Sequence, residues 1–320
     1  MTDTVPIALF AYSRPLHLAR TLESLRANNL PLIYAFSDGP KTPHAAPAVA
    51  KVREIIKSVD WCEVIVCERE QNWGLGRSIL AGVTSVLSRH DSVIVFEDDI
   101  ECAPGTYVYL TGALEHYANN PMVMSVTGWT NPRVTPSDVT DKPYFDGRAE
   151  CWVWGAWARS WVGMDQDAGT LVSECLKRGI DIFRYGADLP RMARLEEKRN
   201  IWAVRWVYLH MLRGGLCMRP PYALVENVGF GELATNTGDN WEWPHVELSG
   251  CPPVPVQWPA AVEHQACPQL WRSVYGQTTL GYFCKRARGI ARSNTNAICN
   301  WSAKLIGAGR EKRSRHETDS

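Results

Sequence analysis

The chain contains 320 residues, of which 45% are hydrophobic and 21% are charged. These proportions are ordinary for a soluble globular protein, so they exclude a disordered, collagen-like or coiled-coil chain. Lys and Arg together number 34, as do Asp and Glu, which gives a formal net charge of zero. This balance argues against a nucleic-acid-binding protein that relies on bulk positive charge. A chain of this length can also bury a large core without crosslinks.

The cysteines and the first residues of the chain predict its compartment. Ten cysteines are present, but none form a CxxC pair, so a structural zinc site is not expected. Residues 1–6 carry no basic segment of the kind that begins a secretory signal. We therefore expect a cytoplasmic protein with reduced thiols. No apolar run reaches the ~18–20 residues that a membrane span requires.

The first third of the chain alternates between short apolar runs and segments with helical periodicity. A helix is expected to begin near Pro15, which suits a first helical turn, with Ser13 as a candidate cap. The other predicted helices cover residues 48–58 and 78–88, and the predicted strands cover residues 5–12, 32–37, 62–67 and 92–96. This strand–helix alternation with short links predicts an α/β fold with a mostly parallel central sheet flanked by helices.

The remainder of the chain is less regular. A strand is expected at residues 122–127, and helices are expected at residues 106–117, 167–178 and 202–213. We interpret residues 1–128 and 129–250 as two halves of one domain, and residues 251–320 as a C-terminal extension.

The end of the chain is basic. Residues 285–320 carry nine Lys and Arg residues against three acidic residues. A solvated tail is the simpler interpretation, and we favour it from Arg310 onward. The alternative is that residues 282–305 form a basic amphipathic segment that contacts anionic lipid, which would place the protein at the inner face of a membrane.

Tryptophan is unusually frequent, and twelve of the 14 Trp residues lie from Trp129 onward. These rings could pack the core, or they could form a wall for a planar or sugar-like ligand. Trp154 and Trp157 are three residues apart, so on a helix they would share one face. In the second case, residues 152–161 would line the site of that ligand.

Three adjacent acids, Glu97, Asp98 and Asp99, follow the fourth predicted strand directly. Their negative charges repel one another, and a divalent cation that bridges to phosphate oxygens would remove this repulsion. Carboxylate oxygens are ligands that suit Mg²⁺ or Mn²⁺. A surface turn could also tolerate three acids in water, but the run VIVF leads straight into these three.

Three further polar groups follow the other strands. Residues 72–78 (NWGLGRS) contain two glycines, which allow a ligand to approach the backbone, before a helix whose N-terminus favours negative charge. Asp38 could be a turn residue, or its carboxylate could accept a hydrogen bond from uracil N3. Arg14 could be a surface residue, or it could balance phosphate charge. Because ligands bind past the carboxyl ends of such strands, we expect the four groups to converge.

These segments together carry a family resemblance. The ordered set FAYSRP, FSDGP, NWGLGRS and FEDDI resembles the nucleotide-binding half of GT-A glycosyltransferases. It is most similar to the branch that contains the animal N-acetylglucosaminyltransferases that begin complex N-glycans, with bacterial relatives, in which the metal motif is also EDD. The resemblance covers roughly residues 5–240. It continues more loosely in VWGAW with Trp161, in NIWAVRW and in ENVGFGE, at residues 153–161, 200–206 and 226–232.

The resemblance implies a GT-A fold and an enzyme that uses a nucleotide-sugar donor, for which a UDP-sugar is expected. Asp99 would hold Mn²⁺ or Mg²⁺, which would stabilise the leaving diphosphate. Asp38 would face the base and Asp98 would lie near the ribose. The other residues expected near the donor are Arg14, Asn72, Gly74, Arg77 and Glu97. The acceptor would be a glycan or a lipid-linked sugar, and transfer would be of the inverting type.

The sequence departs from the family at two positions. Asn200 stands where this branch carries an acidic general base, and an amide cannot take up the proton of an acceptor hydroxyl. Asn236 stands where bacterial relatives often have His. Either another carboxylate is the base, or the reaction is unusual, or the chain is a nucleotide-sugar-binding protein that has lost activity. The candidate bases are Glu232, which we place first, and Glu150, Asp165, Glu196 and Glu197.

A nucleotidyltransferase is the remaining alternative, because such enzymes share this order of strands. It would need a basic, Gly-rich loop after the first strand. The segment FAYSRPLHL does not have that composition.

Overall fold

The structure is a computed structural model that describes residues 4–199, 201–229, 248, 250 and 256–276. Contacts within the chain divide it into a compact unit of residues 1–275 and a second unit of residues 276–320. The two predicted halves, 1–128 and 129–250, both lie within the first unit. The basic segment predicted at residues 282–305 lies outside the described residues.

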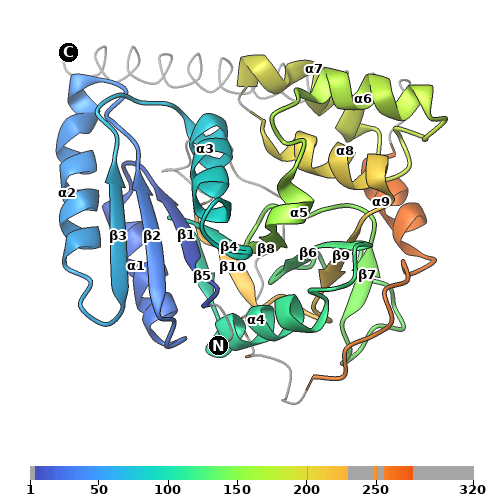
Figure 1. Cartoon of the computed structure of the whole chain (residues 1–320), viewed down its shortest axis with the longest axis horizontal. Coiled ribbons are helices and arrows are strands. Elements are labelled where there is room, and N and C mark those ends of the chain that lie inside the picture. Colours follow the sequence, from blue (N-terminus) through green and yellow to red (C-terminus); the bar gives the residue numbers. More distant parts are fainter. Residues whose placement is uncertain (1–3, 200, 230–247, 249, 251–255, 277–320) are drawn as a thin grey trace, which may run out of the picture. The chain divides into compact units, whose positions relative to one another are not determined.

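One sheet organises the first unit (Figure 1). Its strands, in spatial order, are β3 (Glu63–Glu68), β2 (Leu32–Ser37), β1 (Ile7–Ala11), β4 (Ser92–Glu97), β8 (Trp154–Trp157), β6 (Val123–Thr127), β9 (Leu216–Arg219) and β7 (Tyr144–Asp146). Strands β1 to β4 run parallel, as do β6 and β9, whereas β8 and β7 are antiparallel to their neighbours. The predicted α/β class with a mostly parallel central sheet is confirmed. A separate ribbon pairs β5 (Ile100–Cys102) with β10 (Val225–Asn227).

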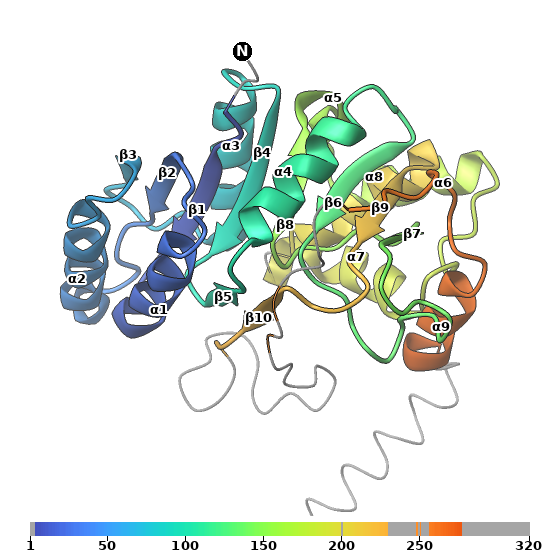
Figure 2. The same ribbon diagram turned by 90° about the horizontal axis from the view of Figure 1, so that it is seen from below.

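Helices flank the sheet, as predicted. Seen from below, α1 (Pro15–Arg26) and α2 (Ala46–Lys57) cover one face of the first strands, and α3 (Leu75–Leu87) lies on the opposite face (Figure 2). The other helices are α4 (Thr106–His116), α5 (Ala158–Trp161), α6 (Ala168–Lys177), α7 (Asp188–Arg199), α8 (Ala203–Arg213) and α9 (Cys267–Tyr275), with a 3₁₀ turn, η1, at Pro43–Ala45. No helix within the described residues has the length and apolar character that a membrane crossing requires.

The two faces of the sheet form two hydrophobic cores. Side chains alternate along a strand, so Ala8 and Phe10 of β1 join the core beneath α3. Ile7 and Leu9 join the core beneath α1 and α4. Because both faces of the central strands are covered, their sequences are continuously apolar rather than alternating.

The Trp-rich segment differs from its prediction. Residues 154–157 form strand β8 rather than a helix, so Trp154 and Trp157 point to opposite faces. Trp154 is fully buried in the core beneath α3, and Trp157 is buried in the other core. The prediction of one shared helical face was wrong, because the β8 backbone pairs with both β4 and β6. Both rings are core residues.

Helix boundaries also depart from the sequence pattern. Helix α3 begins at Leu75 rather than Ser78, because Gly74 adopts a φ of 75° that ends the preceding turn. Helix α1 begins at Pro15 as predicted, but its cap position is Arg14, which makes no side-chain capping bond, rather than Ser13. Helix α7 was not predicted, because its sequence is mostly charged and polar, although Leu189, Met192 and Ala193 recur at helical spacing.

Candidate functional site

The acidic trio lies where β4 ends beside the end of β1. Phe10 of β1 pairs with Glu97 of β4, so the chain beyond β1 passes the carboxylates. The backbone N–H of Tyr12 donates to Asp98 Oδ2 at 2.9 Å, and Thr21 Oγ1 donates to the Asp98 carbonyl at 3.1 Å. Asp98 is therefore buried and held by the backbone of the first β–α connection.

Asp99 forms an ion pair with Arg14. Arg14 Nη1 donates to Asp99 Oδ2 at 2.7 Å, and both side chains are 14% exposed. The second oxygen, Oδ1, is buried and has no hydrogen-bond partner among the described residues. Gly229 covers the pair so closely that a Cβ atom there would collide with the Asp99 carboxylate and the Arg14 guanidinium. Two of the four predicted polar groups thus meet here, with one carboxylate oxygen left over.

Burial and mutual repulsion disfavour negative charge in the trio. Burial raises the pKa of Glu97 to about 8 and that of Asp98 to about 7, and the neighbouring Asp99 adds to both shifts. Burial also raises the pKa of Asp99, against the opposing effect of the Arg14 cation. A cation bound at this end of β4 would lower these pKa values and favour the ionised carboxylates.

The other two predicted groups meet around Asp38. Its carboxylate accepts the backbone N–H groups of Gly39, Trp73 and Gly74 at distances of 2.9–3.1 Å. Asn72 Nδ2 donates to the Gly39 carbonyl at 2.9 Å. Asp38 is buried, and both of its oxygens hold the turn that leads into α3. Its carboxylate therefore positions residues 72–74.

A cationic stack lies beside this turn. The guanidinium carbons of Arg77 and Arg69 lie 4.2 Å and 4.5 Å from the ring of Trp73. Arg69 is buried and donates to Ser78 Oγ at 2.8 Å, whereas Arg77 is exposed. Trp73 and Arg69 also line a cavity of about 480 Å³ beside edge strand β3. The sequence did not predict this stack, since Arg69 lies outside the glycine-containing segment.

Glu150 lies in a second acidic cluster. The sequence did not predict its partners there, Asp146 and Arg219. Arg219, at the end of β9, is fully buried and donates to Asp146 Oδ2 at 2.9 Å and to Glu150 Oε2 at 3.2 Å. Trp271 Nε1 donates to the same Asp146 oxygen at 2.7 Å. The second Glu150 oxygen accepts the backbone N–H of Cys151 at 2.9 Å. Both carboxylate oxygens of Glu150 are thus engaged, one in a buried ion pair and one in a backbone hydrogen bond.

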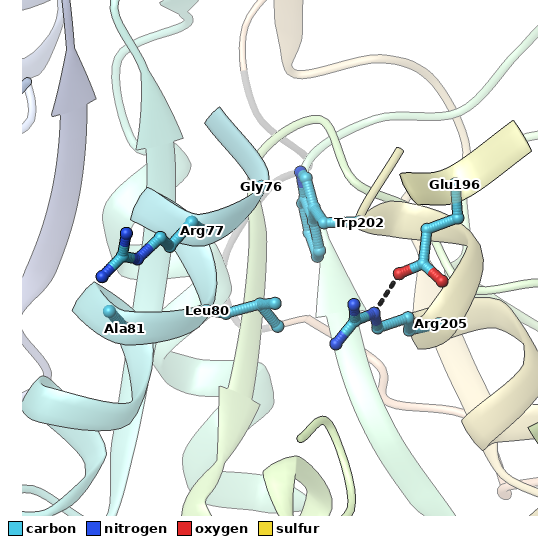
Figure 3. Close-up of a pocket in the computed structure, with 7 residues that line it drawn as sticks. All are labelled: Gly76, Arg77, Leu80, Ala81, Glu196, Trp202 and Arg205. Atoms are coloured by element: carbon cyan, nitrogen blue, oxygen red, sulfur yellow. Dashed lines mark hydrogen bonds and ion pairs between the residues drawn. The ribbon is translucent and has the colours of Figure 1, made fainter. Parts of the chain in front are cut away.

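A cavity of about 330 Å³ separates α3 from α7 and α8 (Figure 3). Leu80 and the first turn of α3 form one wall, and Trp202 and Arg205 form the other. Glu196, another base candidate, pairs with Arg205 Nε and accepts the backbone N–H of Ala168 at 2.7 Å. The candidate base Glu232 and the side chain of Glu197 lie outside the described residues, as does Asn200, which stands at the position of the family's base. Asp165 is exposed, between α5 and α6.

The fit to a divalent metal rests on Asp99. Within the described ranges, no group of three or more His, Cys, Asp or Glu side chains is arranged to hold a metal ion. However, Mg²⁺ and similar ions in phosphate-handling sites commonly take one or two carboxylates and complete their shell with phosphate oxygens and water. The unpartnered Asp99 Oδ1, in a cluster with excess negative charge, fits that mode.

Comparisons with known proteins leave the family open. No protein-family model matches the chain, and no curated protein matches it. One similar solved structure is a mannosyltransferase from Pyrobaculum calidifontis in complex with GDP-Man and Mn²⁺, with a TM-score of 0.36 and 11% identity. The match covers 48% of this chain and 44% of that one.

A UDP-glucose pyrophosphorylase complexed with UDP-glucose is also similar, with a TM-score of 0.27 and 14% identity. This match covers 45% of this chain and 64% of that chain. The chain therefore spans less than two thirds of the length of either protein. At these TM-scores the likeness carries no weight for function, which has to be argued from the site.

Proposed function

We propose that the chain is a metal-dependent glycosyltransferase with a GT-A fold, which transfers a sugar from a nucleotide-sugar, a UDP-sugar, to a glycan or a lipid-linked acceptor. The observation that carries the proposal is the buried acidic trio at the end of β4, with Asp99 Oδ1 unpartnered beside Arg14. Ligands of open α/β sheets bind at this edge. The cation of a nucleoside diphosphate would supply the positive charge that this edge lacks, and the phosphate oxygens would complete the shell of that cation.

Residue roles follow from this arrangement. Asp99 would bind Mn²⁺ or Mg²⁺, and the ion would neutralise charge on the diphosphate leaving group. Arg14 would turn from Asp99 toward a phosphate. Glu97 and Asp98 would flank the ribose and diphosphate. The turn at residues 72–74, held by Asp38, would lie along the nucleotide, with Arg77 in the first turn of α3.

The alternative is a nucleotide-sugar-binding protein without transferase activity. Its support is that Glu150 and Glu196 are each bound to an arginine, which leaves neither carboxylate free to take up a proton. Our first choice of general base for an inverting transfer remains Glu232. A screen of UDP-, GDP- and dTDP-sugars for Mn²⁺-dependent hydrolysis and transfer separates the two candidates, because a binding protein would show affinity without turnover.

Calorimetric titration with UDP tests the donor site directly. Binding should require Mn²⁺ and should be lost in chelator. Asp99→Asn removes the charge at nearly constant shape and should weaken UDP binding in Mn²⁺ by at least about tenfold, since charge-assisted contacts contribute roughly 1.5–3 kcal/mol. Asp60→Asn, at an exposed position before β3, is the matched control. Equal UDP affinity in Mn²⁺ and in chelator would refute the proposal.

A further inference from the structure

We infer that the cavity between α3 and α8 binds an anionic sugar residue, one that carries a carboxylate or a phosphate. The inference deepens the proposed function, because it assigns a chemical class to the acceptor that such an enzyme would use. It rests on the cavity itself and on the residues that form its two walls (Figure 3).

Arg205 is the cation on the α8 wall of the cavity, where it is paired with the carboxylate of Glu196. Its Nε is bound by Glu196, and Nη1 makes only a long contact, 3.4 Å, with the Met164 carbonyl. Figure 3 shows the guanidinium directed from α8 toward α3, across the cavity. Nη2 has no partner among the described residues. A guanidinium fixed through Nε presents its terminal N–H groups as a fork, which matches the two oxygens of a carboxylate or phosphate.

Arg205 is held rigidly in this orientation. Glu196 uses its second oxygen to accept the backbone N–H of Ala168, so one carboxylate ties together α6, α7 and α8. A side chain that is already ordered loses little entropy when it binds a ligand. The Arg205 side chain is 21% exposed, which leaves its amino groups accessible from the cavity.

Trp202 gives the cavity a flat wall. Its ring packs 5.7 Å from that of Trp154, within a cluster that also contains Trp161 and Trp206. The opposite wall is Leu80. Flat indole faces suit the C–H surfaces of sugar rings, and a small number of fixed polar groups sets the orientation in such sites. A volume of about 330 Å³ lies at the lower end for ligand sites, so it suits a single sugar residue.

Arg77, on the α3 wall, is not directed into this cavity. Figure 3 shows the Arg77 guanidinium directed away from Trp202, and it stacks on Trp73. Arg205 therefore provides the recognition, and one cation favours one anionic group on the ligand.

Saturation-transfer NMR tests the assignment with three probes, and each titration is repeated with UDP and Mn²⁺ present. Methyl β-D-glucuronide and D-glucose 6-phosphate carry the two anionic groups, and methyl β-D-glucoside is neutral. At least one charged probe should bind at least about tenfold more tightly than the glucoside. The tenfold difference should be lost in Arg205→Gln. Equal binding of all three probes, or no binding of either charged probe, would overturn the inference.

Arg205→Gln leaves Glu196 without its partner, so a second variant keeps the test independent of folding. Ala81→Glu adds a carboxylate at an exposed position on the cavity wall and should weaken the charged probe alone. Arg89→Gln changes net charge equally at the far end of α3 and should leave all probes unaffected. Unchanged binding of the charged probe to Ala81→Glu would contradict the assignment.

Parallel titration with UDP and Mn²⁺ separates this inference from the proposed function. UDP binding without binding of a charged probe would refute the cavity assignment alone. Probe binding without UDP binding would refute the donor site and leave the cavity assignment standing. Displacement of the probe by UDP would make the cavity part of the donor site and would overturn its assignment to an acceptor.

Discussion

Two acidic clusters, one around Arg219 at the end of β9 and one after β4, are satisfied to very different extents. Asp146 and Glu150 share a fully buried arginine, and their oxygens also accept backbone and indole N–H groups. Glu97, Asp98 and Asp99 have one arginine between them, and Asp99 Oδ1 has no described partner. Nothing further is required to stabilise the first cluster, whereas a cation would stabilise the second. Incomplete pairing, rather than acidity, therefore marks the candidate site.

The largest expected effect comes from breaking the satisfied cluster. Arg219→Met leaves two carboxylates buried without a counter-charge, and the free energy of unfolding should fall by about 3–5 kcal/mol. Urea denaturation followed by circular dichroism measures this loss. Arg20→Met is the matched control, because Arg20 is 60% exposed in its pair with Glu101 and such pairs contribute about 0–1 kcal/mol. Comparable losses in the two variants would contradict the comparison.

A smaller effect on the free energy of unfolding is expected from the protonation of His210, a buried side chain with both ring nitrogens hydrogen-bonded. His210 is fully buried, its Nδ1 donates to the Trp206 carbonyl at 2.9 Å, and Ser125 Oγ lies 2.8 Å from Nε2. Burial lowers its pKa from 6.5 to about 3. As the pH falls below 6.5, the unfolded state takes up a proton that the folded state does not, so stability declines until the pH approaches 3.

The decline attributable to His210 should reach about 1.4 kcal/mol per pH unit. Unfolding free energies measured between pH 4 and 8 should show a shallower dependence in His210→Gln than in the wild type. The exposed residue His44 provides the control variant, His44→Gln. If His210→Gln kept the full slope, the neutral buried state of His210 would be wrong.

Gly229→Ala should have the smallest effect on stability. It tests the acidic trio most directly, because the new methyl group would contact Asp99 and Arg14. The new methyl group has to displace the ends of Arg14 and Asp99, which are movable side chains, so the unfolding free energy should fall by only about 1 kcal/mol. UDP affinity in Mn²⁺ should fall more strongly. Gly169→Ala, in the first turn of α6, is the control. Unchanged UDP affinity would separate the acidic trio from nucleotide binding.

The sequence predicted the fold of the first third of the chain well, because each strand there is a continuous apolar run and each helix has a clear period. Strand β8 could not be recognised, since its antiparallel pairing with β4 and β6 depends on residues distant in sequence. Trp154 and Trp157 were therefore assigned the spacing of a helix, whereas they lie on opposite faces of a strand. Helix α9 follows a proline-rich segment and docks through Trp271 onto a cluster that residues 146–150 and Arg219 form.

The sequence predicted that four polar groups would converge, and the structure brings them together as two pairs. Arg14 with Asp99, and Asp38 with residues 72–74, follow from their positions after parallel strands. The Asp38 carboxylate accepts hydrogen bonds from backbone amides. The sequence could not show this, because an aspartate that holds a turn and one that binds a ligand look alike in sequence. Arg205 was missed because its pairing with Glu196 joins two helices, α7 and α8, and nothing in the sequence shows that these two side chains meet.

The insertion of β8 between two parallel sets of strands has a consequence for synthesis. Residues 1–128 contain β1 to β4 and their covering helices, yet β4 stays unpaired on one side until β8 has been made. At about 5–20 residues per second, the ribosome needs a few seconds to add that segment. During this interval a strand with four consecutive apolar residues, 93–96, presents unpaired backbone groups, and such an edge can pair with other chains. We therefore expect the nascent chain to be most prone to pairing with other chains between the completion of β4 and the synthesis of β8.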